Sequence, residues 1–289
     1  MTEHFPSVGV IGLDPFFGMM LTPARALGVD LVSFKLGMQI DVLAQCVVTT
    51  TIGDFVSASQ VRTLEKDGVI FRPSSASLSS IKEWNKSRAT GFRGHNNSEA
   101  KYSVLVARSP HGQASSWVPT EIDHSSSHEM TITPAPSLTS TQIIDLQSQA
   151  LGLIRELEFV GVMDVEILLE DGKLVVSHMS VGPTLNGLWT IEGARTSQFE
   201  QHLRAILDLP LGDPSLTAGT TVSSTYSGEG NMYRPYLHLM ARSPDLKFHQ
   251  YRSEALRARG HVTAMGEDLL DLRECVTHAV EYMSGVIDE

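Results

Sequence analysis

The segment TIEGARTSQFEQHLRAILDLPLGD, residues 190–213, indicates a capped helix followed by a helix stop. Ser197 and Glu200 form a Ser-x-x-Glu capping box, in which the two side chains satisfy backbone N–H groups at the start of a helix. The pattern predicts a helix from Ser197 to about Leu207, after which a proline and a glycine end it.

Strand and helix patterns alternate on both sides of that helix, which indicates an α/β or α+β chain. The predicted strands are 8–11, 29–34, 101–109, 114–123, 129–136, 160–169, 173–180 and 260–266. The predicted helices are about 19–27, 140–157, 197–207 and 269–284, and residues 234–251 hold one further helix and one further strand.

The composition shifts between Arg72 and about Glu99, where serine, asparagine and glycine replace periodic apolar residues. Such a composition is typical of a connecting segment. It predicts a linker with at most one short helix.

The apolar strand at 160–169 carries two carboxylates, Asp164 and Glu166, which lie on one face because side chains alternate along a strand. An Asp-Gly turn after it predicts a hairpin. A two-residue turn places Glu166 opposite Ser177, whereas a one-residue bulge places it opposite His178. In either register these side chains lie close together on adjacent strands.

The totals exclude several functional classes. The chain has 289 residues, 42% of them hydrophobic, and a formal net charge of −11. A net negative charge argues against nucleic acids and anionic membranes as partners. No membrane-length apolar run or signal peptide is evident, and Cys46 and Cys275 are the two cysteines. We therefore expect a cytoplasmic protein with two free thiols and a small-molecule ligand.

Several segments, in order along the chain, resemble the ATP-dependent N5-carboxyaminoimidazole ribonucleotide synthetases, a family of the ATP-grasp superfamily. The matching segments are TIEGARTSQFEQHLRAILDLPLGD, YSVLVARSPHGQ, EFVGVMDVEILLEDGKLVVS, HLMARSPDLKFHQY and RARGHVTAMGED. The resemblance is strong from Tyr102 to Asp213, fair beyond Tyr236 and weak before Ser80.

Members of that family bind ATP and two magnesium ions and transfer a carboxyl group to aminoimidazole ribonucleotide. The resemblance assigns the first acidic metal ligand of the family to Glu166. At the second metal position, where the family has Asn-Glu, this chain has Ser177 and His178. An imidazole is a poor ligand for magnesium, which prefers oxygen. A substrate-facing arginine of the family is replaced by Gly182.

The resemblance also implies the domain organisation of an ATP-grasp-derived α/β protein. We expect a reduced N-terminal α/β domain (1–80), a linker or remnant (81–100), an ATP-grasp-like core (101–218) and a C-terminal lobe (219–289). Most of the central subdomain is expected to be missing, because about twenty residues separate Ser80 from Ser103. A homodimer is implied by the family.

These losses favour a scaffold repurposed for ATP-independent chemistry, without a metal or cofactor. Glu166 and His178 would be its catalytic acid–base pair, in a cyclisation, isomerisation or elimination within the former nucleotide cleft. Two alternatives stay open. One is a non-catalytic paralogue that regulates a partner enzyme, and the other is residual synthetase activity.

The expected substrate-binding residues surround that pair or belong to a partial phosphate clamp. They are Asp164, Ser177, Met179, Leu185, Asn186, Leu188, Trp189, Tyr251, Arg257 and Arg259. For Asp164 the alternative is a hydrogen bond to a neighbouring loop, for Trp189 core packing, and for the two arginines a solvated face. Arg195, Glu200 and His202 are expected to be structural, and His111, His124 and His128 lack a zinc-binding spacing.

Overall fold

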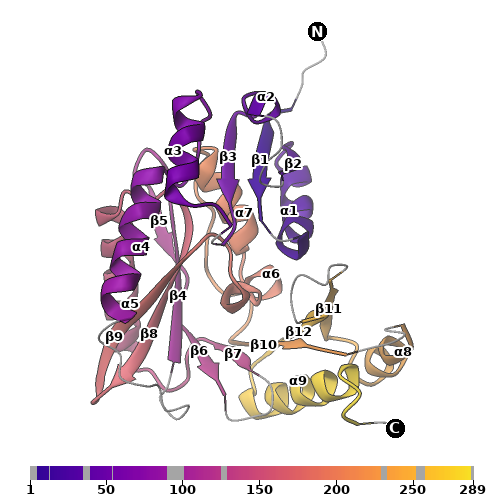
Figure 1. Cartoon of the computed structure of the whole chain (residues 1–289). Coiled ribbons are helices and arrows are strands. Elements are labelled where there is room, and N and C mark those ends of the chain that lie inside the picture. Colours follow the sequence, from indigo (N-terminus) through magenta and orange to yellow (C-terminus); the bar gives the residue numbers. More distant parts are fainter. Residues whose placement is uncertain are drawn as a thin grey trace.

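The computed structural model describes residues 5–12, 14–34, 40–53, 55–89, 101–124, 129–228, 233–251 and 258–287. Its strands form two sheets, one of three parallel strands and one of nine antiparallel strands (Figure 1). No helix in the described ranges combines the length and apolar character needed to cross a bilayer. The α/β fold class predicted from the alternating pattern is confirmed.

The parallel sheet has the strand order β2-β1-β3, with β1 (Ser7–Ile11) between β2 (Asp30–Phe34) and β3 (Val48–Thr51). Helix α1 (Asp14–Ala26) joins the first two strands and starts five residues earlier than predicted. It ends before Gly28, whose φ of 66° is a conformation that glycine adopts without strain. The remaining helices of this part are α2 (Ile40–Leu43) and α3 (Ala58–Lys66).

Helix α4 (Ser75–Ala89) corrects the prediction of a linker over residues 72–99. It has fifteen residues, and buries Leu78 and Ile81 in the main core. The amide of Asn85 donates to the carbonyl of Met179 at 2.8 Å and accepts from its N–H at 3.0 Å. Tertiary contacts therefore stabilise a helix in a segment whose own helix propensity is weak. Residues 90–100 lie outside the described ranges.

The large sheet has the order β11-β12-β10-β7-β6-β4-β8-β9, with β5 paired to β4. Its strands are β4 (Lys101–Arg108), β5 (Ala114–Ser116), β6 (Thr120–Asp123), β7 (Met130–Thr133), β8 (Gly161–Glu170), β9 (Lys173–Val181), β10 (Thr220–Tyr226), β11 (Lys247–Gln250) and β12 (Gly260–Gly266). The predicted strand at 114–123 is thus two strands, and β10 is a strand that the sequence analysis missed. Because β10 pairs with β7, the sheet continues across the expected boundary at 218/219.

Helices cover this sheet at several places (Figure 1). They are α5 (Ser140–Glu156), α6 (Thr190–Gly193), α7 (Gln198–Ile206), α8 (Tyr233–Arg242) and α9 (Leu269–Met283), with a short 3₁₀ turn at Leu185–Gly187. The predicted cap of α7 is confirmed, since the Ser197 hydroxyl accepts from the Glu200 N–H. The cap of α5 is Thr139, one residue before the predicted Ser140.

Helix α7 joins the two sheets through the buried ring of His202. Its Nδ1 accepts from the N–H of Val162 on β8 at 3.1 Å, and its Nε2 lies 2.9 Å from Thr50 Oγ1 on β3. Burial lowers the pKa of His202 to about 3. The ring is therefore neutral at physiological pH, and the prediction of a structural role for His202 fits these contacts.

Candidate active site

The β8–β9 hairpin places Glu166 directly opposite His178. A register shift follows Glu166, so that Ser177 is the extra residue of a bulge. The Ser177 hydroxyl donates to the backbone carbonyl of Glu166 at 3.1 Å. Of the two registers left open by the sequence, the structure has the bulged one.

Lys101 belongs to the same group, and the sequence analysis missed it. Its Nζ lies 2.9 Å from Oε2 of Glu166, with side chains 27% and 19% exposed. Lys101 begins β4 and pairs with Leu168, two residues along β8 from Glu166. Long side chains reach such diagonal neighbours in a sheet. Lys101 could not be predicted because the sequence does not show that β4 pairs with β8.

Asp164 lies two residues before Glu166 on β8 and is fully buried. Its carboxylate accepts from Ser103 Oγ at 2.6 Å, from Thr184 Oγ1 at 2.8 Å and from Asn186 Nδ2 at 2.9 Å. Burial, and then the charge of Glu166, raises the pKa of Asp164, against the effect of its three donors. Asp164 therefore anchors the loop after β9, which is the structural alternative considered for it.

The other predicted binding residues fall into three groups. Met179, Leu188 and Trp189 are at most 2% exposed and pack in the core, so a ligand reaches them only by displacing packed side chains. Leu185 is 38% exposed at the loop tip. Arg257 lies outside the described residues, and Arg259 follows that gap at the start of the turn into β12.

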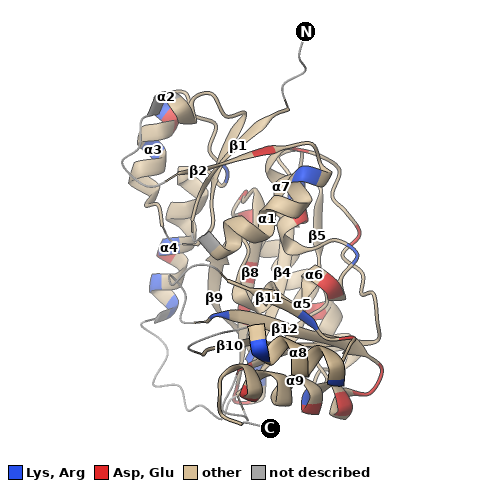
Figure 2. Ribbon diagram, turned by 90° about the vertical axis from the view of Figure 1, so that its right-hand side faces the viewer, with Lys and Arg blue, Asp and Glu red and all other residues tan. Residues whose placement is uncertain are grey.

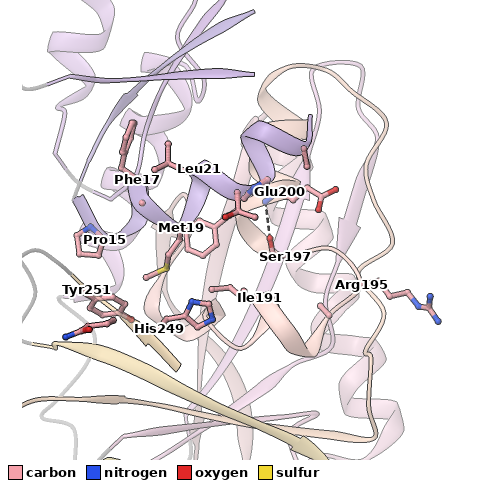
Figure 3. Close-up of a pocket in the computed structure, with 17 residues that line it drawn as sticks. Pro15, Phe17, Met19, Leu21, Ile191, Arg195, Ser197, Glu200, His249 and Tyr251 are labelled. Atoms are coloured by element: carbon pink, nitrogen blue, oxygen red, sulfur yellow. Dashed lines mark hydrogen bonds between the residues drawn. The ribbon is translucent and has the colours of Figure 1, made fainter. Parts of the chain in front are cut away.

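Tyr251 lines a different site, a pocket of about 790 Å³ between α1, the α6–α7 segment and β11. Figure 3 shows Pro15 and Met19 on one side of this pocket and His249 and Tyr251 on another. No local pattern predicted this pocket, because its walls come from three segments that lie far apart along the chain. The structure does not bring Tyr251 to Glu166 and His178.

Charged side chains are interspersed along the helices of the C-terminal lobe, as Figure 2 shows for α9. Glu166 and Lys101 differ from these because both are largely covered and lie on the sheet. A half-buried ion pair beside an imidazole can exchange a proton or hold a cation.

Comparison with known proteins shows which proteins the chain is related to. An ATP-grasp domain model matches residues 95–199. The N5-carboxyaminoimidazole ribonucleotide synthase of Mycobacterium bovis is 39% identical over 191 residues, which cover 63% of this chain and 44% of that protein. The chain is a relative of the N5-carboxyaminoimidazole ribonucleotide synthetases, within the ATP-grasp superfamily.

More distant relatives agree with this assignment. The Bacillus subtilis synthase is 32% identical over 167 residues, and the match spans 43% of its length. This chain therefore spans less than half of the length of the curated proteins it matches. The solved synthetase structure from Thermotoga maritima superimposes with a TM-score of 0.80 at 20% identity, covering 96% of this chain and 98% of that one. That match confirms the ATP-grasp fold.

The donors on β8 and β9 fit one magnesium ion. Proteins commonly hold magnesium through one or two carboxylates together with substrate phosphates. Glu166 supplies one carboxylate, whereas His178 supplies a nitrogen that magnesium disfavours. The ammonium of Lys101 also competes with a metal ion for Glu166. The described residues therefore suit a single, weakly held ion.

Proposed function

We propose that the protein is a carboxylating ligase of the N5-carboxyaminoimidazole ribonucleotide synthetase type, with weakened magnesium binding. The observation that carries this proposal is the carboxylate of Glu166 on β8, at the position that the resemblance assigns to a metal ligand, in a chain 39% identical to a synthase over 191 residues. These findings favour the synthetase alternative over the ATP-independent function expected first.

Each residue of the hairpin has a distinct role in this proposal. Magnesium–ATP, when bound, supplies the phosphoryl group that activates bicarbonate. Glu166 would hold the metal, and Lys101 offsets the carboxylate charge when the metal is absent. Asp164 fixes the loop after β9 through Thr184 and Asn186. His178 accepts the proton that the substrate amine releases.

The test is phosphate release from ATP by the purified protein, with magnesium, bicarbonate and aminoimidazole ribonucleotide. We expect slow release that requires the ribonucleotide and falls at least tenfold in Glu166→Gln, which keeps the shape and removes the charge. The matched control is Glu170→Gln at the far end of β8, which should retain the rate. No ribonucleotide-dependent release by the wild-type chain would contradict the proposal.

A second candidate function rests on one observation about the same hairpin. Glu166 faces His178 in register on the adjacent strand. The Glu166–His178 pair would then act as acid and base on a substrate that needs no ATP.

The two candidates differ in their need for ATP. Under the second, turnover of an organic substrate persists after ATP and magnesium are removed, and the double variant Glu166→Gln with His178→Ala abolishes it. Retained turnover in that variant would exclude the assigned roles. The homodimer implied by the family is also a proposal, and light scattering of the purified chain measures it.

A further inference from the structure

A second group of polar side chains lies where the C-terminal lobe meets α6, outside the β8–β9 hairpin. His249 on β11 and His261 on β12 are direct cross-strand partners, and their rings stack with centroids 4.5 Å apart. Cross-strand partners project from the same face of a sheet, so both imidazoles point to one region. Glu192 of α6 joins them, with its Oε1 2.5 Å from His249 Nε2.

Two buried atoms of this group have no hydrogen-bond partner among the described residues. They are Nε2 of His261 and Oε2 of Glu192. His261 is fully buried, and burial together with the charge of His249 lowers its pKa well below the usual value. The Tyr251 hydroxyl lies 2.9 Å from its Nδ1 and orients the ring. The remaining nitrogen, Nε2, is left without a partner inside the group. It offers a lone pair in the tautomer whose Nδ1–H donates to the Tyr251 hydroxyl.

We infer that Glu192, His249 and His261 form a binding site for a divalent transition-metal ion of the zinc class. One ligand atom from each residue lies within 4.8 Å of the other two. Two imidazoles and a carboxylate with an open fourth position are a common ligand set for catalytic zinc. His249 also lines the pocket, so the proposed site reaches the pocket through this ring (Figure 3).

Binding requires a small rearrangement. Ligand atoms around a tetrahedral zinc ion with bonds of 2.0–2.1 Å are about 3.3 Å apart. The stacked rings must therefore turn, which is easiest for the side chain of His249, 32% exposed. The ion replaces the proton between Glu192 Oε1 and His249 Nε2, and that proton leaves to solvent. The hydrogen bond between the Tyr251 hydroxyl and His261 Nδ1 already orients one of the proposed ligands.

The open position sets the class of ligand that the pocket takes. A water molecule, or an oxygen of a carboxylate or phosphate in the pocket, completes the coordination. Magnesium is not expected here, because it prefers oxygen ligands. The inference is independent of the proposed ligase function, which depends on Glu166.

The experiment titrates the chelator-treated full-length protein with Zn²⁺ by calorimetry and with Co²⁺ by visible absorption. We expect one ion per chain and a tetrahedral cobalt spectrum without a thiolate band, which excludes Cys46 and Cys275 as ligands. His249→Gln and Glu192→Gln should each weaken zinc binding at least tenfold. The matched control is His111→Gln, whose side chain is 88% exposed and which should bind zinc as the wild type does.

Three outcomes of the zinc and cobalt titrations overturn the inference. They are no stoichiometric zinc binding, binding that survives both variants, and a thiolate band in the cobalt spectrum. Magnesium added in excess should leave the cobalt spectrum unchanged. Loss of the cobalt spectrum on addition of magnesium would also contradict the ligand set. Thermal unfolding of each apo variant verifies that the variants are folded, and His249 is suited to the test because it is only partly buried.

Discussion

Glu166 on β8 and Lys101 on β4 form an ion pair of 2.9 Å on the face that also carries His178. Both side chains are largely covered, so removing one partner leaves a poorly solvated charge and costs more than breaking a surface salt bridge. The pair neutralises the carboxylate that the ligase proposal assigns to the metal. The ion pair thus couples stability to cation binding.

Replacing Lys101 by Met leaves Glu166 half-buried without a partner. We expect a loss of about 1 kcal/mol, or about 2–4 °C in Tm. We also expect tighter binding of magnesium, because the competing ammonium is gone. Differential scanning calorimetry with and without magnesium measures both effects. The control is Lys173→Met on the exposed start of β9, which should change neither.

Gly182 occupies the position that the resemblance assigns to a substrate-facing arginine. Its φ is 78°, and a Cβ there would lie 3.2 Å from Ile52 Cα and from the Thr51 carbonyl. The sequence suggested a chemical reason for the glycine, and the structure adds a steric one. Restoring the side chain by Gly182→Arg is expected to cost about 2–3 kcal/mol, which chemical denaturation measures.

The control for that substitution is Gly172→Arg in the β8–β9 turn. Gly172 has a similar φ of 74° but has no atom within 4 Å of its virtual Cβ. It therefore carries the backbone penalty alone, about 1 kcal/mol. Equal costs at the two positions would show that close packing against β3 is not the constraint.

His202 makes stability depend on pH in a defined window. Its pKa is about 3 in the folded chain and about 6.5 when unfolded, so the unfolded state binds the extra proton first. The contribution is fully present above pH 6.5 and is lost as the pH falls towards 3. At pH 4.5 the loss is about 3 kcal/mol.

Denaturant unfolding at pH 7 and pH 4.5 tests this, with His202→Gln as the comparison. The variant should lose less stability between the two pH values, because glutamine does not titrate. His111→Gln, at an exposed position, should keep the wild-type dependence. An unchanged pH dependence in His202→Gln would contradict the neutral buried ring.

Asn85 fastens α4 to β9 through two hydrogen bonds to the backbone of Met179. Asn85→Ala leaves those backbone groups unpaired at a part-buried position, which is expected to cost about 1–3 kcal/mol. Amide exchange in α4 should quicken accordingly. Lys86→Ala on the exposed face should have little effect. Equal exchange in the two variants would mean that these bonds do not hold the helix.

The elements that sequence reasoning predicted are those whose signals are local. The N-cap of α7 and the Asp-Gly hairpin each depend on residues a few positions apart, and both were placed correctly. Of the predicted capping box only the Ser197 half is formed, because the Glu200 carboxylate accepts from Arg204 instead. Helix α4 and strand β10 were missed because both are rich in serine and threonine. In β10, Ser223 is buried and donates to the carbonyl of Val262, a partner that only the folded sheet provides.

The candidate site was predictable to the same extent. The chain itself brought Glu166 and His178 together through one hairpin, so two registers could be stated in advance. Lys101, the anchoring of Asp164 and the pocket beside His249 depend on strands paired across long sequence separations. No local pattern encodes such pairings.

The most direct test of the ligase account is calorimetry of ATP with magnesium against the wild type and His178→Glu. The variant supplies the second carboxylate that magnesium prefers. The account predicts weak binding to the wild type and binding at least tenfold tighter in the variant, with His124→Glu as the charge-matched control that stays weak. Absence of ATP binding in both the wild type and His178→Glu would contradict it.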